Sequence, residues 1–243
     1  MPISNLSDRQ KKLLCAVIEE YIEEAKPIGS QNLVAKCKLE VSPATVRNEM
    51  VRLLEEGLLD KPHSSSGRVP TTMGIRLYLS DLMREEELPV IEEVSLKQRL
   101  WPQRFSEIGL WYEGAMALAD SAKNLAVVLA GDYIFSAGAV SILENPEFFD
   151  IDVTRTVLHL LDRRDLLSEL FSKVASDREV HTLLGSELGL TNLLPCGLVF
   201  ARFGTKDGEG SIGVLGPNRM DYARVLPRVR YMAELLSELS REW

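Results

Sequence analysis

Residues 27–79 read PIGSQNLVAKCKLEVSPATVRNEMVRLLEEGLLDKPHSSSGRVPTTMGIRLYL and alternate helix signals with turn signals. Gly29-Ser30 provides a turn and an N-cap for a short helix that runs to about Lys36. After the connection CKLEV, Ser42-Pro43 provides a second N-cap with proline at the first helical position. Gly57 supplies the left-handed residue at which this second helix stops. A short helix, a tight turn and a capped helix predict a helix-turn-helix unit.

The flanking sequence completes a winged helix. Ser7 and Gln10 form a capping box that opens a first amphipathic helix, which stops before Pro27. Leu58-Leu59 begins a short extended segment, and the polar stretch HSSSGRVP is typical of a hairpin tip with a return strand. Thr72 can cap a fourth helix through residue 83. Residues 1–84 are therefore predicted to form a winged helix-turn-helix domain that binds DNA.

The helix after Ser42 has a face suited to the major groove. A projection at about 100° per residue places Val46, Met50, Leu53 and Leu54 on one side of residues 43–56. The opposite side is small or polar. On that side an asparagine amide can bond adenine, a threonine can touch a thymine methyl or a phosphate, and an arginine can bond guanine or the backbone. The candidate DNA contacts of this helix are Ser42, Ala44, Thr45, Arg47, Asn48 and Arg52.

The predicted wing adds small hydroxyl donors, a bare backbone and a guanidinium, which suit phosphate or minor-groove contact. Its candidate contacts are His63, Ser64, Ser65, Ser66, Gly67 and Arg68. Two plainer interpretations stay open. The helix face can be an ordinary solvated surface, and His63 can be an uncommitted loop histidine.

Charge is divided unevenly along the chain. The net charge of the 243 residues is -8, but residues 1–84 carry 12 Lys and Arg against 11 Asp and Glu. Residues 85–243 carry 16 against 25, so the acidity belongs to the C-terminal part. Residues 26–76 carry 8 basic against 5 acidic side chains, a mild excess where DNA contact is predicted.

The composition is that of a globular protein, with 45% hydrophobic and 26% charged residues. No stretch approaches the roughly 18 apolar residues that a membrane span needs, so no membrane partner is expected. The N-terminus lacks an apolar signal-peptide core. Cys15, Cys37 and Cys196 fit neither a disulfide framework nor a zinc motif and are expected to be reduced thiols. These features favour a cytoplasmic location.

The second part of the chain alternates helices with short apolar runs. Residues 85–106 are predicted to be a charged helical linker interrupted by Pro89. Residues 107–243 are predicted to form an α+β sensor-like module with a small sheet. Its expected strands are NLAVVLA, DYIFSAG, GLVFARF and SIGVLG, and its expected helices cover residues 107–123, 153–161, 163–175 and 220–243.

A search for catalytic patterns finds little. His159 and His181 have no Cys or Asp at ligand spacing, so structural roles are expected for both. The turn GPNRMDY can bind an anion ahead of a helix, or it can be a plain strand-to-helix turn in which Arg219 and Asp221 make local contacts. No P-loop, nucleophile elbow or metal signature is present. The sequence therefore predicts neither an enzyme nor a cofactor.

The residues also resemble a known family. Residues 27–79, and SPATVRNEM with PHSSSGRVPT above all, are similar to the winged-helix domain of the heat-inducible transcription repressors, the HrcA family. ILENPEFFD resembles a Pro-Glu-Phe segment of that family, and GSIGVLGPNRMDYARVLPRV resembles its closing strand, turn and helix. The resemblance implies a repressor of chaperone genes that acts as a homodimer on double-stranded DNA at an inverted-repeat operator. It also implies a GroEL-type chaperonin as a partner.

The chain departs from the family in the middle. NLAVVLAG is followed almost at once by DYIFSAGA, where family members carry part of a GAF-like sheet and an inserted dimerisation region. In HTLLGSELG the family's Glu-Asn pair is missing, because Glu187 is followed by Leu188. The resemblance thus implies that residues 107–243 form a reduced GAF-like α+β domain for regulation and dimerisation. Two other functions stay open: a winged-helix regulator whose C-terminal domain senses a small ligand, and a winged-helix protein-interaction adaptor.

Overall fold

The structure, a computed structural model, describes residues 6–37, 41–62, 67–174, 179–206 and 208–240. The chain divides into two compact units, Met1–Arg84 and Glu85–Trp243. Helices and antiparallel strands occur in both units, which confirms the predicted α+β class.

The first unit has the element order that the sequence predicts. Three helices precede a pair of short strands, and two further helical segments follow them. The strands pair antiparallel, with Leu59 opposite Pro70 and Asp60 opposite Val69. The elements are α1 (Asp8–Glu24), α2 (Ser30–Cys37), α3 (Pro43–Glu55), β1 (Leu59–Asp60), β2 (Val69–Pro70), α4 (Thr72–Leu77) and the π-helix η2 (Tyr78–Leu82).

The predicted helix boundaries hold for α1 and α3. The Ser7 hydroxyl accepts a bond from the Gln10 N–H, and the Gln10 side chain accepts one from the Ser7 N–H, which completes the capping box. Ser42 caps α3, and Gly57 beyond its end has a φ of 71°. The fourth helix corrects one prediction: its cap is Thr71 rather than Thr72, because the Thr71 side chain accepts the Gly74 N–H at 3.0 Å.

The wing is tied to the segment before α2. Ile28 and Arg68 exchange two main-chain hydrogen bonds of 2.8 and 2.9 Å. Gly67 allows this approach, because a Cβ on it would lie 2.4 Å from the Ile28 carbonyl oxygen. Beneath the helices lies a core of aliphatic side chains that includes Leu14, Val17, Ile18, Leu33, Val46, Met50 and Leu53.

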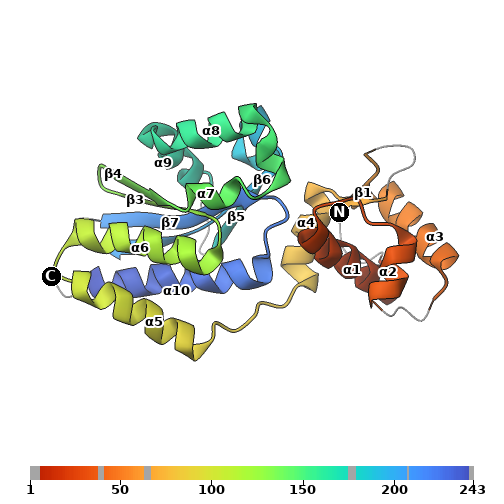
Figure 1. Cartoon of the computed structure of the whole chain (residues 1–243), viewed down its shortest axis with the longest axis horizontal. Helices are drawn as coiled ribbons and strands as arrows, with labels where there is room; N and C mark the ends of the chain where they lie inside the picture. The colour runs from red at the N-terminus through yellow and green to blue at the C-terminus, as the bar shows by residue number, and fades with distance from the viewer. Residues whose placement is uncertain (1–5, 38–40, 63–66, 175–178, 207, 241–243) are drawn as a thin grey trace. The chain divides into compact units, whose positions relative to one another are not determined.

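The second unit is built on a five-stranded antiparallel sheet in the order β4-β3-β7-β6-β5. Figure 1 shows α6 and α10 on one face of this sheet, α5 outside them, and α7, α8 and α9 on the opposite face. β3 is buried along most of its length because helices cover both faces. The strands are β3 (Leu125–Ala130), β4 (Tyr133–Ala137), β5 (His181–Leu184), β6 (Cys196–Thr205) and β7 (Gly208–Pro217).

The predicted helices of this unit are present to within a few residues, and α7 is absent from the prediction. They are α5 (Val90–Leu100), α6 (Glu107–Ala122), α7 (Ala139–Ile142), α8 (Ile151–Leu161), α9 (Arg164–Ser172) and α10 (Tyr222–Ser240). The 3-10 turns are η3 (Trp101–Gln103), η4 (Pro146–Phe149), η5 (Gly185–Leu188) and η6 (Thr191–Leu193). One strand, β5, is absent from the prediction.

Residues 85–106, predicted as a linker, contain a helix that is packed into the second unit. Leu96 and Leu100 of α5 are buried. The almost fully buried guanidinium of Arg228 in α10 pairs with Glu92 of α5 at 2.6 Å. The many charges that suggested a linker are thus used to hold α5 against α10.

Candidate nucleic-acid interface

Helix α3 has one buried and one exposed side, as its sequence predicts. Val46, Met50 and Leu53 are buried in the core of the first unit, and Leu54 is half-buried. Ala44, Arg47, Asn48 and Val51 are exposed and follow the spacing i, i+3, i+4, i+7. They form a continuous stripe along the helix, which we call the reading stripe. Three of its four side chains are uncharged, and all four are exposed.

Arg47 and Asn48 are adjacent in the middle of the reading stripe. Both side chains are exposed, and neither makes an ion pair with another described residue. A guanidinium and a carboxamide side by side offer donors for guanine and a paired donor and acceptor for adenine. The structure thus places the candidate Arg47 on the stripe itself.

Thr45 lies at the border of the stripe rather than on it. Its main-chain N–H donates to the Ser42 hydroxyl at 3.2 Å, and its own hydroxyl is 2.9 Å from the same oxygen. Ser42 therefore uses its side chain to cap α3, which orients the first turn of the helix. The exposed Ser42 and the half-exposed Thr45 are positioned by each other.

Arg52 is held by a residue that the sequence reasoning missed. Glu49 is buried, with 4% exposure, and its carboxylate pairs with Arg9 of α1 and lies 3.5 Å from the Arg52 guanidinium. Arg52 keeps 64% of its side chain exposed, so it can still contact a phosphate. The signal for Glu49 was its helical spacing from Val46 and Leu53, which places an acid on the core side of α3.

The wing is described only in part. Gly67 and Arg68 are half-exposed, and both lie next to the strand segment at Ile28. Arg68 directs its main chain to Ile28, and its guanidinium lies 3.4 Å from the Gly67 carbonyl oxygen. Gly67, a predicted DNA contact, thus also allows the close packing of the wing against Ile28. The candidates His63, Ser64, Ser65 and Ser66 lie outside the described residues.

The other candidate sites resolve into structural contacts. His181 is buried against Phe200, with ring centroids 5.1 Å apart, whereas His159 is exposed at the end of α8. Arg219 makes long-range contacts. Its guanidinium binds Glu147 at 2.7 Å and Asn145 at 2.8 Å, both far away in sequence. Within the described residues no His, Cys, Asp and Glu side chains gather as a metal site.

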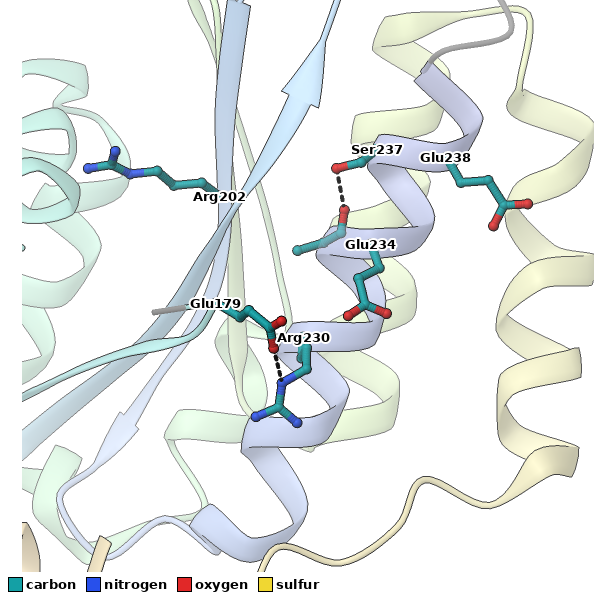
Figure 2. A pocket seen from close by; sticks show the side chains of 7 residues that line it. Glu179, Arg202, Arg230, Glu234, Ser237 and Glu238 are labelled. Carbon is teal, nitrogen blue, oxygen red and sulfur yellow. Dashed lines mark hydrogen bonds and ion pairs between the residues drawn. The ribbon is translucent and has the colours of Figure 1, made fainter. Parts of the chain in front are cut away.

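A cavity of about 450 Å³ lies beside α10 in the second unit. Figure 2 shows that Arg202 points away from α10, while Arg230 meets Glu179. Arg230 also pairs with Glu85 at 2.7 Å, and the Ser237 hydroxyl donates to the Ala233 carbonyl oxygen at 2.8 Å. The Arg230 guanidinium at this cavity is thus paired with two acids, Glu85 and Glu179. The residues around the cavity are Glu179, Arg202, Arg230, Ala233, Glu234, Ser237 and Glu238.

The sequence matches the profile of the HrcA protein C-terminal domain over residues 44–226. The chain belongs to the HrcA family. Among its HrcA relatives, the heat-inducible transcription repressor of Pelotomaculum thermopropionicum is 26% identical over 336 residues, covering 96% of this chain and 97% of the relative. That of Carboxydothermus hydrogenoformans is 25% identical over 337 residues, covering 96% and 98%. These alignments are longer than this chain, so the HrcA relatives contain internal residues that have no counterpart here.

A solved structure shows the same fold. The crystal structure of a hypothetical protein, described at 2.2 Å resolution, superposes with a TM-score of 0.81 and 17% sequence identity. The superposition covers 98% of this chain and 99% of the other. The HrcA relatives are named heat-inducible transcription repressors, the family that the sequence resembles. None of the described helices is long and apolar enough to cross a membrane.

Proposed function

We propose that this HrcA-family chain represses heat-shock genes by placing α3 in the major groove of an inverted-repeat operator. The reading stripe of Ala44, Arg47, Asn48 and Val51 is the observation that carries this proposal. Its residues are exposed while the opposite side of α3 is buried, so the stripe is available for base edges. Asn48 reads adenine, and Arg47 reads guanine or binds the adjacent phosphate.

Around this stripe, the other candidates contact the DNA backbone. Arg52, with most of its side chain exposed, binds a phosphate beside the groove. Ser42 and Thr45 lie at the N-terminus of α3, where main-chain N–H groups favour a phosphate. The wing residues His63, Ser64, Ser65, Ser66, Gly67 and Arg68 contact the neighbouring backbone or the minor groove.

The assembly that fits this role is a homodimer in the cytoplasm, because two copies related by a two-fold axis present two α3 helices to two half-sites. A GroEL-type chaperonin is the partner that the family resemblance suggests for the heat response. For the chaperonin, the support is the family membership alone.

The base-reading part is tested with duplexes selected from a random library by the full chain. Asn48→Ala should lose about 1–3 kcal/mol of discrimination at one adenine position. Arg52→Ala should weaken all duplexes about equally and reduce the salt dependence of binding. Lys12→Ala, which removes an exposed cation of α1, is the matched control. Absence of saturable binding to any selected duplex would overturn the proposal, and pull-down of a protein partner that survives Asn48→Ala would favour an adaptor.

A further inference from the structure

Strand β4 is an open edge of the five-stranded sheet. It is paired with β3 on one side only, and residues 133–136 are exposed or half-exposed. At the other edge, His181, Leu183 and Leu184 of β5 are buried. Edge strands in monomers commonly carry Lys, Pro or a bulge that prevents pairing with another chain. The sequence of β4, YIFSA, carries neither Lys nor Pro, and its register with β3 runs without a bulge.

Exposed aromatic side chains lie next to this edge. Tyr133 and Phe135 of β4 stack with their centroids 6.1 Å apart, and Tyr112 of α6 meets Phe135 edge-on at 6.3 Å. Tyr112 is 51% exposed, and Ile108, one turn earlier on α6, is 48% exposed. We call Ile108, Tyr112, Tyr133 and Phe135 the β4 patch. It places an apolar surface alongside unpaired main-chain groups.

The hairpin geometry decides which main-chain groups of β4 point outward. Gly131-Asp132 is a two-residue turn, so Ala130 and Tyr133 form the closing hydrogen-bonded pair. Because hydrogen-bonded and non-hydrogen-bonded pairs alternate, Phe135 also directs its N–H and C=O groups to β3. Ile134 and Ser136 direct theirs away from the sheet. These two residues are the pairing groups of the open edge.

We infer that a second copy of this chain pairs antiparallel with β4 about a two-fold axis at Phe135, which joins the two sheets into one. In this register the main chain of Ile134 in each copy exchanges hydrogen bonds with the main chain of Ser136 in the other copy. Phe135 faces its own copy in a non-hydrogen-bonded pair, where side chains come closest. The two β4 patches then cover each other on the α6 side of the joined sheet.

The charges at the two ends of β4 favour a second copy over another occupant. Asp132 precedes the strand; it lies 3.6 Å from Arg164 and still keeps 95% of its side chain exposed. The exposed Lys123 lies near the other end, because a Cβ on Gly138, just after β4, would lie 2.5 Å from the carbonyl oxygen of the following residue, Asn124. The two-fold axis brings Asp132 opposite Gly138 of the second copy, and so beside its Lys123. At both ends the exposed Asp132 carboxylate of one copy thereby gains a second cation, Lys123 of the other copy, which favours this register.

The inference deepens the proposed function, since it supplies the dimer that an inverted repeat requires. Its test measures the full chain without DNA, so the two can fail separately. Sedimentation velocity should show a dimer. Ser136→Pro removes an outward N–H but no bond to β3, and Tyr112→Asp places a charge in the β4 patch. Each should raise the dimer Kd at least about 100-fold while the melting curve of the monomer stays cooperative.

Ile91→Asp is the matched control, because Ile91 is 82% exposed on α5 and lies outside the β4 patch. This variant should sediment as the wild type does. A monomeric wild type at every concentration would overturn the inference. So would a dimer that survives both Ser136→Pro and Tyr112→Asp, or one that is lost only in Ile91→Asp.

Oxidative cross-linking tests the register itself. Two copies of Phe135→Cys would place their Cα atoms about 4.5 Å apart, within disulfide range. Two copies of Tyr133→Cys would be displaced by about 13 Å along the strand, beyond that range. Rapid cross-linking of Phe135→Cys with little of Tyr133→Cys is expected. Equal cross-linking of the two variants, or none of Phe135→Cys in a chain that sediments as a dimer, contradicts the register.

Discussion

Glu49 shows how one buried carboxylate can serve two helices. It lies on the core side of α3, where it pairs with Arg9 of α1 and approaches Arg52 one turn further along. A buried carboxylate needs such partners, because the loss of solvation is costly without them. Glu49 therefore fixes the rotation of α3 about its axis and, with it, the direction in which the reading stripe faces.

Replacing this carboxylate by an amide tests its role. Glu49→Gln keeps the shape of the side chain but removes the charge that both arginines face, so it should lower the free energy of unfolding by about 1–3 kcal/mol. Urea denaturation of the full chain measures the change. Glu55→Gln, an exposed neighbour on α3, is the control and should stay within about 0.5 kcal/mol of the wild type. Equal effects of the two substitutions would show that Glu49 has no special role.

The two described free cysteines are also governed by burial. Burial and the nearby Glu19 raise the pKa of Cys15 to about 11, and burial and Glu147 raise the pKa of Cys196 to about 12. Since the thiolate is the reactive form, both thiols should resist alkylation at neutral pH in the folded chain. Mass spectrometry after iodoacetamide treatment should find both unmodified until urea is added. Rapid native labelling of Cys196 would contradict this expectation.

At the scale of elements, the wing depends on a close approach of two chain segments. A Cβ at Gly67 would lie 2.4 Å from the Ile28 carbonyl oxygen, so Gly67→Ala must displace the backbone there. We expect a loss of about 1–3 kcal/mol in stability and weaker binding to selected duplexes. Gly29→Ala is the control, because nothing lies within 4 Å of its added Cβ. If urea denaturation finds Gly67→Ala as stable as Gly29→Ala, the wing does not need this contact.

The attachment of α5 to α10 rests on an ion pair between two distant segments. Glu92→Ala leaves the Arg228 guanidinium without its carboxylate partner while 6% of that side chain is exposed. The expected loss is about 3 kcal/mol in the stability of the second unit. Glu93→Ala, at the adjacent position on α5, should have a much smaller effect. Hydrogen exchange across residues 90–100 measures where the loosening occurs, and equal exchange in the two variants would argue that α5 is held by Leu96 and Leu100 alone.

At the scale of the whole molecule, a dimer makes stability depend on concentration. If two copies pair through β4, the apparent Tm of the full chain should rise with protein concentration, because association stabilises only the folded state. Ser136→Pro should remove this dependence. Calorimetry over a hundredfold range of protein concentration measures this dependence, because such a range changes the free energy of association by about 2.7 kcal/mol. A Tm that is independent of concentration in the wild type would mean that the folded chain is a monomer.

Local signals sufficed for the parts of the fold that neighbouring residues decide. Ser42-Pro43 and Gly57 predicted the limits of α3, and the helical spacing of its apolar residues predicted its buried side. Thr71 and Thr72 are equivalent as sequence signals, and only the hydrogen bond to Gly74 distinguishes the cap.

Long-range partners explain what the sequence did not predict. Glu49 and Arg9 are 40 positions apart, and Glu92 and Arg228 are 136 apart, so no local pattern connects them. For this reason α5 resembled a solvated linker although it is packed. Strand β5 is only four residues long, and its pairing with β6 is decided by the sheet rather than by its own composition.

The turn at Gly131-Asp132 is also an engineering opportunity. An added Cβ at Gly131 meets nothing within 4 Å, and both turn residues are exposed. Extending a surface turn costs only about 0.6 kcal/mol for each doubling of its length. A short epitope inserted there would lie beside Asp132, at the end of β4, so it would compete with a second copy for this edge and its accessibility would report in living cells whether β4 is covered.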